Sequence, residues 1–250
     1  MIPRRYVDGF TKALNAVSED MRRRLADELA AIDMTRPVAE VRQQVVELMQ
    51  SYCGGASDMA AVLAAEFYDG LRSYELGEPM GALAVSGRKP EATEGAVRAF
   101  AQKLVDGKPD EFRELCIERL DYEVKTAAER AVLINGARDR RRPRFARVST
   151  GNETCDLCLM LASCGFVYRS ADSATHTHAN CDCRVTPSWN ANEVEGYDPK
   201  AIYDRWQGQV DQMARERADR KGTSFEDELQ AIMDRYRRAS ENARQRMRGR

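Results

Sequence analysis

The chain has 250 residues, and its 39 Lys and Arg side chains nearly balance its 40 Asp and Glu side chains, which leaves a formal net charge of −1. With 43% hydrophobic and 32% charged residues, the composition is typical of a folded, charge-rich protein and excludes a chain disordered throughout. The longest nearly unbroken apolar stretch, residues 59–65, is far shorter than the roughly 20 residues of a membrane-spanning helix. The two arginines near the N-terminus lack the apolar segment of a secretory signal, so we expect a cytosolic-type chain.

The first 136 residues predict an amphipathic helical domain. Apolar residues at steps of three and four predict a first helix over residues 4–32. Thr35 and Pro37 are a cap and an early helical proline, which predict a second helix that Gly54–Gly55 ends. A third, alanine-rich helix is expected to begin at residue 57 or 58.

Glycine and proline then divide the rest of this helical domain. Residues 76–92 hold three glycines and two prolines and predict a loop. A helix over residues 93–105 should follow, and a long helix should begin at Pro109 and stop at Asn135–Gly136.

A compact basic segment follows the helical domain. Residues 137–147 carry six arginines and one acidic residue, whereas residues 1–136 carry five more acidic than basic side chains. The segment predicts a linker, whose arginines either are solvated or contact the DNA backbone without regard to sequence. The candidate DNA-contacting residues are Arg138, Arg140, Arg141, Arg142, Arg144 and Arg147.

Residues 148–190 predict a small β-type module, and residues 198–250 predict a C-terminal pair of helices. Short β-like pieces at 145–148, 166–168 and 184–185 are too few to bury a core of their own. Small domains of this size need a metal ion or disulfides. The predicted fold class is therefore mainly α, with a zinc-stabilised β-knuckle between a helical body and two final helices.

The cysteines favour a metal site over a disulfide framework. Five of the seven cysteines and both histidines fall within residues 155–183. An odd cysteine count and the lack of a secretion signal disfavour disulfides. A Cys-x-x-Cys pair, followed after about 20 residues by a His/Cys cluster, is typical of one structural Zn²⁺ per chain. The candidate ligands are Cys155, Cys158, His178, Cys181 and Cys183.

The preferred ligand set is Cys155, Cys158, His178 and Cys181, with Cys183 as the close substitute for Cys181. His178 and Cys181 fit a turn that enters a strand, and Cys183 lies on the same face as Cys181 if that segment is extended. His176 is expected to be a loop residue or a hydrogen-bond donor to a ligand. Cys164 has no partner at ligand spacing and is expected to be a small buried residue.

The sequence disfavours a zinc enzyme. A catalytic zinc keeps an open coordination position and needs a nearby general base. The deaminase signature is absent, because Asn180 stands where that signature has its glutamate. A nuclease of the HNH type would have to use His176 as its base. We therefore expect no catalytic site and no small-molecule substrate.

Three stretches of the sequence resemble a known family. The stretches are Val148–Gly151, Thr154–Ser163 with its Cys-x-x-Cys-Leu-x-Leu-Ala-Ser pattern, and His178–Pro187 with its His-x-x-Cys-x-Cys and following proline. Together they resemble the MuF-like minor head (head morphogenesis) proteins of tailed bacteriophages, in the form found in phages of actinobacteria. Glu66–Asp69 resembles the same proteins.

The resemblance implies a structural role rather than catalysis. Such a protein acts near the portal vertex in head assembly and in DNA packaging or delivery, with the portal protein and other capsid or scaffold subunits as partners. It would reside in the virion, and in the host cytoplasm during assembly. The alternatives are a zinc-dependent nucleic-acid-binding module and an HNH-type nuclease.

Overall fold

The computed structural model describes residues 1–151, 154, 156–170 and 183–248, with residues 239–240 and 242–248 described by their backbone. Most described residues are helical, and the strands form one small sheet, as the sequence predicts. In chain order the elements are α1 (Arg4–Ala31), α2 (Val38–Leu76), α3 (Pro90–Phe100), α4 (Gln102–Val105), α5 (Pro109–Arg138), β1 (Arg144–Ser149), α6 (Asp156–Ala162), β2 (Cys183–Ser188), α8 (Pro199–Lys221) and α9 (Phe225–Arg248).

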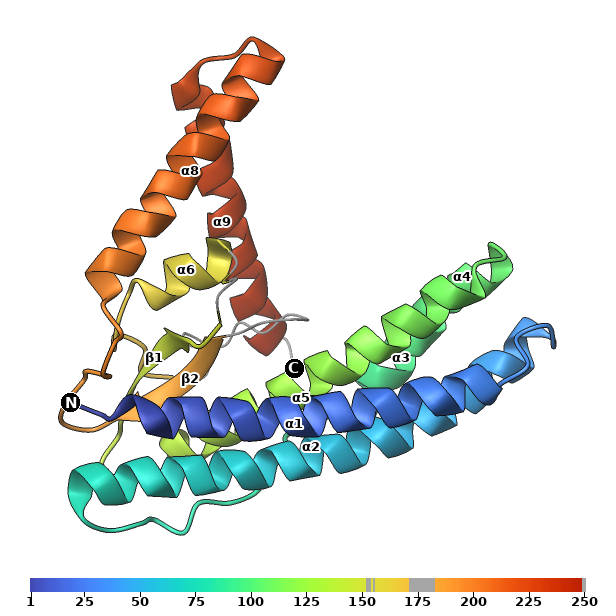
Figure 1. The fold of residues 1–250 in the computed structure, drawn as a ribbon, viewed down its shortest axis with the longest axis horizontal. Helices are drawn as coiled ribbons and strands as arrows, with labels where there is room; N and C mark the ends of the chain where they lie inside the picture. The colour runs from blue at the N-terminus through green and yellow to red at the C-terminus, as the bar shows by residue number, and fades with distance from the viewer. Residues whose placement is uncertain (152–153, 155, 171–182, 249–250) are drawn as a thin grey trace.

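Three long helices form the body of the protein. Helices α1, α2 and α5 lie side by side, and α3 and α4 pack at one end of this layer (Figure 1). The apolar stripe of α1 is buried against α2 and α5, with Leu14, Leu25 and Leu29 almost fully covered. The rings of Phe10 and Phe67 stack with centroids 4.4 Å apart and join α1 to α2.

Helix α2 is a single helix of 39 residues, so the prediction of two helices divided at Gly54–Gly55 was wrong. Each glycine inside a helix costs only about 1 kcal/mol relative to alanine. Met49, Cys53 and Ala56 are fully buried on either side of the pair. The apolar face thus continues across the glycines, and its burial outweighs their low helix propensity.

Helix α5 also passes its predicted end at Asn135–Gly136 and continues to Arg138. The side chain of Asn135 accepts a hydrogen bond from the backbone of Leu83 (2.8 Å) and donates one back to it (2.9 Å), which fixes the 77–89 loop on the body. Gly136 lies under the ring of Phe145, where any Cβ atom would overlap the ring. Both residues therefore serve tertiary packing and do not end the helix.

The two strands form an antiparallel pair that lies on the body near the N-terminus (Figure 1). The register pairs Arg144 with Ser188 and Ser149 with Cys183, and Tyr168 forms an isolated bridge to Phe145. The strands confirm the predicted β-like pieces at 145–148 and 184–185, whereas of residues 166–168 only Tyr168 pairs, through this single bridge. Apolar residues of the strands belong to the same buried core as the helices, which explains how strands so short are stabilised.

A buried carboxylate fastens the end of the sheet to the body. Asp139 accepts hydrogen bonds from the hydroxyl of Tyr68 (3.1 Å), from Nε of Arg72 (3.0 Å) and from Nε1 of Trp189 (3.0 Å). Trp189 follows β2 directly, and its ring meets that of Tyr68 edge to face. The network therefore joins α2, the end of α5 and the segment after β2.

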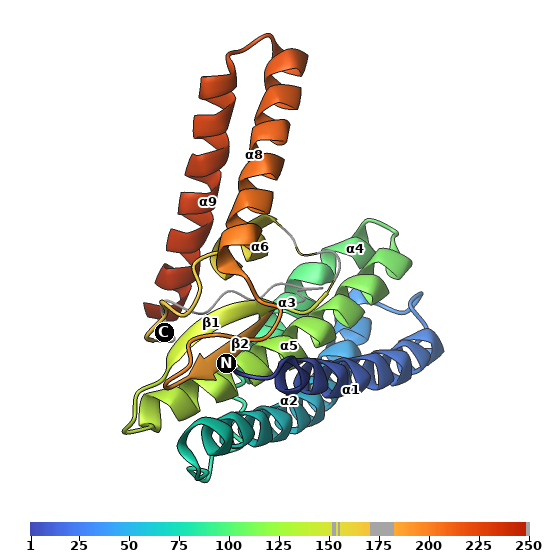
Figure 2. The same cartoon turned by 60° about the vertical axis from the view of Figure 1, so that its left-hand side comes forward.

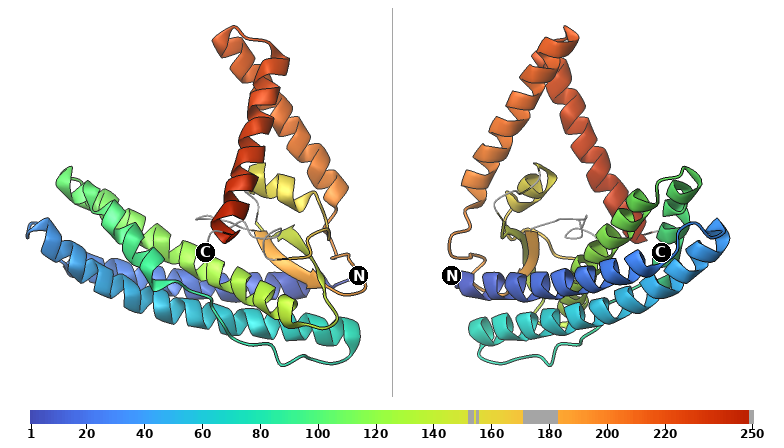
Figure 3. Two further views of the ribbon diagram at one scale, coloured as in Figure 1. Left: turned by 180° about the vertical axis from the view of Figure 1, so that it is seen from behind. Right: turned by 45° about the vertical axis from the view of Figure 1, so that its right-hand side comes forward.

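The last two helices form a hairpin that projects from the body, as Figures 1 and 2 show. Asp198 caps α8, and Ser224 caps α9 by accepting a hydrogen bond from the backbone of Asp227 (3.1 Å). Trp206 and Ile232 belong to a separate small core at the base of the hairpin, which also includes Leu159 of α6. Figure 3 shows α6 between this hairpin and the sheet.

The described helices include none that is both long enough and apolar enough to cross a membrane. The long helices carry charged residues throughout, and α9 begins with three acidic side chains in its first turn.

Candidate metal centre

Two of the predicted zinc ligands meet in the structure. Cys158 lies in the first turn of α6, and Cys183 is the first residue of β2. Their Sγ atoms are 3.4 Å apart, and both residues are buried, with exposed fractions of 0% and 4%. Since 25 residues separate them in sequence, the fold itself creates this pair.

The distance suits two ligands of one metal ion. With Zn–S bonds of about 2.3 Å, two sulfurs of a tetrahedral site are about 3.8 Å apart. A disulfide would need about 2.05 Å, and both cysteines are free thiols here. A shift of a few tenths of an ångström would therefore admit a zinc ion between the pair.

Part of the predicted ligand set lies outside the described residues. Cys155, His178 and Cys181 belong to this part, and so does His176. Within the described ranges, no group of three or more His, Cys, Asp or Glu side chains lies close enough to hold a metal. The described geometry thus brings together Cys158 and Cys183 and places no further ligand beside them.

The local structure around Cys158 is helical, because Asp156–Ala162 forms helix α6. Leu159 and Ala162 of this helix are buried. Packing of these side chains favours the helix and directs Cys158 toward the sheet.

A buried arginine accompanies the cysteine pair. Arg147 is fully buried, and its Nε and Nη2 atoms donate hydrogen bonds to Sγ of Cys183 at 3.2 and 3.1 Å. Its Nη1 atom lies 3.0 Å from a carboxylate oxygen of Glu129 on α5. Arg147 therefore does not belong with the exposed arginines that were predicted to contact DNA.

Sheet register explains why sequence reasoning missed this arginine. Arg147 pairs with Val185, which places Arg147 and Cys183 diagonally on one face of the two-stranded sheet. In the sequence Arg147 is the last of six arginines within eleven positions, and nothing local separates it from the other five. Only the pairing of the strands reveals its different environment.

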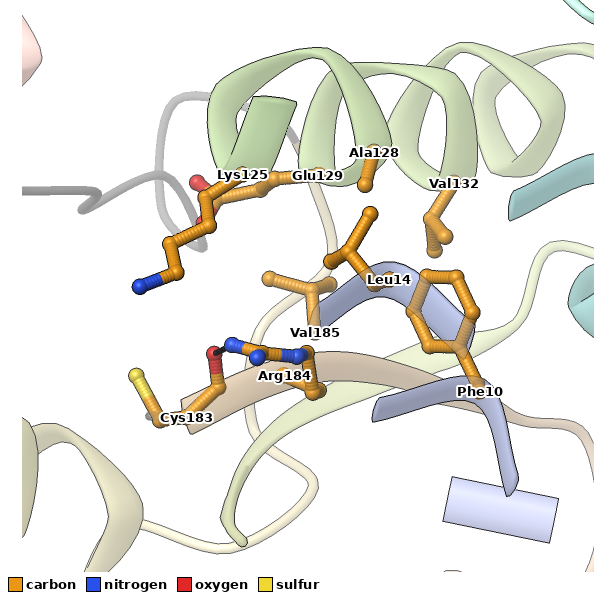
Figure 4. Close-up of a pocket in the computed structure, with 9 residues that line it drawn as sticks. All are labelled: Phe10, Leu14, Lys125, Ala128, Glu129, Val132, Cys183, Arg184 and Val185. Carbon is orange, nitrogen blue, oxygen red and sulfur yellow. Dashed lines mark hydrogen bonds between the residues drawn. The ribbon is translucent and has the colours of Figure 1, made fainter. Parts of the chain in front are cut away.

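Figure 4 shows the seam between the sheet and the body beside this centre. Phe10, Leu14 and Val185 line the apolar part of the seam. Glu129 and Cys183 lie at its polar part (Figure 4). The polar contacts of the centre thus border directly on the hydrophobic core of the body.

The remaining described cysteines behave as ordinary side chains. Burial raises the pKa of Cys53 and the pKa of Cys116 to about 12, so both thiols stay neutral in the helical core. Cys164 is exposed, contrary to the expectation that it is a small buried residue, and its thiol contacts the backbone oxygen of Met160 at 3.4 Å. Cys164 lies after the end of α6, where the chain has turned back toward solvent.

The other five arginines of the basic segment are exposed around the turn between α5 and β1. Asp139 holds this turn by accepting a hydrogen bond from the backbone of Arg141 (2.8 Å), and Arg142 has a positive φ of 46°. The exposed residues of this group are Arg138, Arg140, Arg141, Arg142 and Arg144.

The fold and the site define a mainly helical protein with a two-stranded sheet and a buried cysteine pair. A sequence model of the VG15 protein family matches residues 1–209, and the chain belongs to this family. The name of the family points to a phage-encoded, virion-associated protein. Comparison with curated proteins and with solved structures gave no match.

Proposed function

We propose that the protein is a structural component of the phage head, of the MuF-like minor head type, that acts near the portal vertex. Its partners are the portal protein and other capsid or scaffold subunits, and it takes part in head assembly and in DNA packaging or delivery. The proposal assigns it no catalytic step.

The α8–α9 hairpin carries this proposal. Its helices project from the body (Figures 1 and 2), and they expose Tyr203 and Met233, with exposed fractions of 45% and 37%. Large apolar side chains on a projecting helical element favour contact with another protein. Membership of a phage protein family and the motifs shared with minor head proteins support the same role.

We further propose that a structural zinc ion holds the module over residues 148–190. Cys158 and Cys183 supply two ligands, and Cys155 and His178 are the sequence-predicted remainder, with Cys181 as the alternative. Such a site has no open position, so the ion would tie α6 to β2 and would not activate water. The close approach of the two described sulfurs supports this assignment.

Purified phage particles test the structural role. We expect quantitative mass spectrometry of gradient-purified, infectious particles to detect the protein at a small, fixed copy number per particle. Deletion of its gene should give particles with defects in assembly or infectivity, and wild-type protein supplied in trans should correct them. Absence of the protein from infectious particles and normal infectivity after deletion would contradict the proposal.

The exposed arginines favour an additional contact with packaged DNA, without regard to sequence. If all five bind phosphates, the logarithm of the binding constant should fall with the logarithm of the salt concentration with a slope of about −4.5. Replacement of Arg140, Arg141 and Arg142 by glutamine should reduce the slope to about −1.8.

Three consecutive arginines on α1 provide a matched control for that experiment. Arg23 and Arg24 form ion pairs with Asp20, so glutamine at Arg22, Arg23 and Arg24 should leave the slope nearly unchanged. Equal effects of the two triple variants would contradict a specific role of the turn. A clear sequence preference would favour the nucleic-acid-binding module instead, and zinc-dependent cleavage of the DNA would favour the nuclease.

A further inference from the structure

The most unusual side chain of the described structure is the guanidinium of Arg147. It is the largest fully buried side chain, and its described partners are a carboxylate on one side and a sulfur on the other. Burying a charged group is costly unless it is paired and hydrogen-bonded. The partners of Arg147 must therefore carry enough negative charge to hold it there.

The geometry of these contacts is directional. Nε and Nη2 form one edge of the planar guanidinium, and both donate to the same Cys183 sulfur. Nη1 contacts Glu129, whose residue is only 8% exposed. The carboxylate thus fixes the orientation of the guanidinium, and the guanidinium in turn directs two N–H groups at one predicted metal ligand.

Metal-bound ligands commonly need such partners. Hydrogen bonds from outside the coordination sphere orient a ligand, and their loss typically lowers metal affinity by 10–100-fold. A zinc ion with three thiolates and one imidazole carries a net charge of −1, which a neighbouring guanidinium offsets. The position of Arg147 meets both requirements.

We propose that Arg147 is a positioning residue of the metal site, and that the Glu129–Arg147–Cys183 chain couples zinc binding to the stability of the helical body. This inference rests on the zinc site proposed above. Glu129 belongs to α5, a central helix of the body, whereas Cys183 begins β2. Ordering of the sulfur by the metal therefore stabilises the contact between sheet and body.

The effect of Arg147 on zinc affinity can be measured by competition with a chelator. We expect Arg147→Lys to lower the zinc affinity of the full-length protein at least 10-fold, because an ammonium group keeps the charge but loses the planar pair of donors. Arg147→Met should lower it further. Glu129→Gln should have an intermediate effect, because the guanidinium loses the charged group that orients it.

Cobalt substitution provides a spectroscopic signal of the metal–sulfur bonds. Replacement of Arg147 would leave this signal unchanged if Arg147 only stabilised the fold. Hydrogen bonds from N–H groups lower the energy of the sulfur lone pairs. We therefore expect the sulfur-to-cobalt charge-transfer band of Arg147→Lys to shift to longer wavelength than that of the wild-type protein. If Arg147→Met does not fold, the Lys variant still decides the question through affinity and spectrum together.

Arg119 provides a matched control on the same helix as Glu129. Its Nε and Nη2 atoms both donate to one carboxylate oxygen of the buried Glu123, the former at 3.0 Å. Arg119→Met removes a similar ion pair elsewhere on α5, so it should lower stability without changing zinc affinity or the cobalt spectrum.

The outcomes separate this inference from the proposed metal site. Wild-type protein that binds zinc, with unchanged affinity and spectrum in both Arg147 variants, would overturn the role of Arg147 and leave the zinc site standing. Wild-type protein that binds no zinc would overturn the zinc site and this inference together. Equal losses of affinity in Arg119→Met and Arg147→Met would also overturn the positioning role.

Discussion

Replacement of Cys158 by serine is expected to lower the midpoint of thermal unfolding markedly and to expose the chain around α6 and β2 to proteolysis. Structural zinc contributes on the order of 10 kcal/mol of folding free energy in small modules. Loss of one ligand removes most of that contribution. The far-ultraviolet helical signal should stay largely intact, because most residues of the main core come from α1, α2 and α5.

Circular dichroism and limited proteolysis measure this effect, and Cys164 provides the matched control. Cys164 lies just after α6 and is exposed. Cys164→Ser should therefore have the same midpoint of thermal unfolding and the same resistance to proteolysis as the wild-type protein. Treatment of wild-type protein with a strong chelator should reproduce the Cys158→Ser result. Identical behaviour of the two serine variants would contradict a structural role of the cysteine pair.

Replacement of Asp139 by asparagine is expected to destabilise the protein by about 3–5 kcal/mol, the typical cost of breaking a buried ion pair. The side chain of Asp139 is 1% exposed and that of Arg72 is 8% exposed, so the guanidinium would lose its buried carboxylate and keep the longer contact (3.6 Å) with the exposed carboxylate of Glu78. Chemical denaturation at neutral pH measures the loss of free energy. Arg72→Met in the same chain should recover part of the loss, because it removes the buried charge that has lost its nearest carboxylate.

An exposed ion pair provides the comparison for this prediction. Asp20→Asn breaks contacts with Arg23 and Arg24 at the surface and should cost less than about 1 kcal/mol. A loss for Asp139→Asn as small as that for Asp20→Asn would show that the buried network does not hold the sheet to the body.

The same carboxylate predicts a dependence of stability on pH. Burial raises the pKa of Asp139, but hydrogen bonds from the backbone of Arg141 and from the side chains of Arg72 and Tyr68 outweigh this effect, so the pKa lies below its ordinary value. A carboxyl group with a lowered pKa in the folded state stabilises the protein above its unfolded pKa of about 3.9. The stability difference between wild-type protein and Asp139→Asn should therefore shrink as the pH falls below about 4.

The periodic pattern of the helices could be predicted because burial repeats regularly along them. Apolar residues at steps of three and four gave the first helix within a residue of its observed ends. The glycines at the two predicted helix ends, Gly54–Gly55 and Asn135–Gly136, were misleading, because local propensity is weak compared with burial in a long helix. Gly136 illustrates the point, since its role under Phe145 depends on a strand that follows it in sequence.

The candidate site could be predicted in composition but not in detail. Clustering of cysteines and histidines indicated the segment of the candidate metal site, and spacing favoured Cys181, with Cys183 as its substitute. Strand register places Arg147 beside Cys183, and the packing of α6 against β1 brings Cys158 to within 3.4 Å of Cys183. Register depends on pairing between segments distant in sequence, so local patterns do not contain it.

Metal content of the wild-type protein tests the central claim most directly. The full chain should be purified without added metal, dialysed against metal-free buffer and measured by elemental mass spectrometry together with its protein concentration. The buried cysteine pair predicts one zinc ion per chain. Protein that is folded, has fully reduced cysteines and contains no stoichiometric zinc would contradict the account.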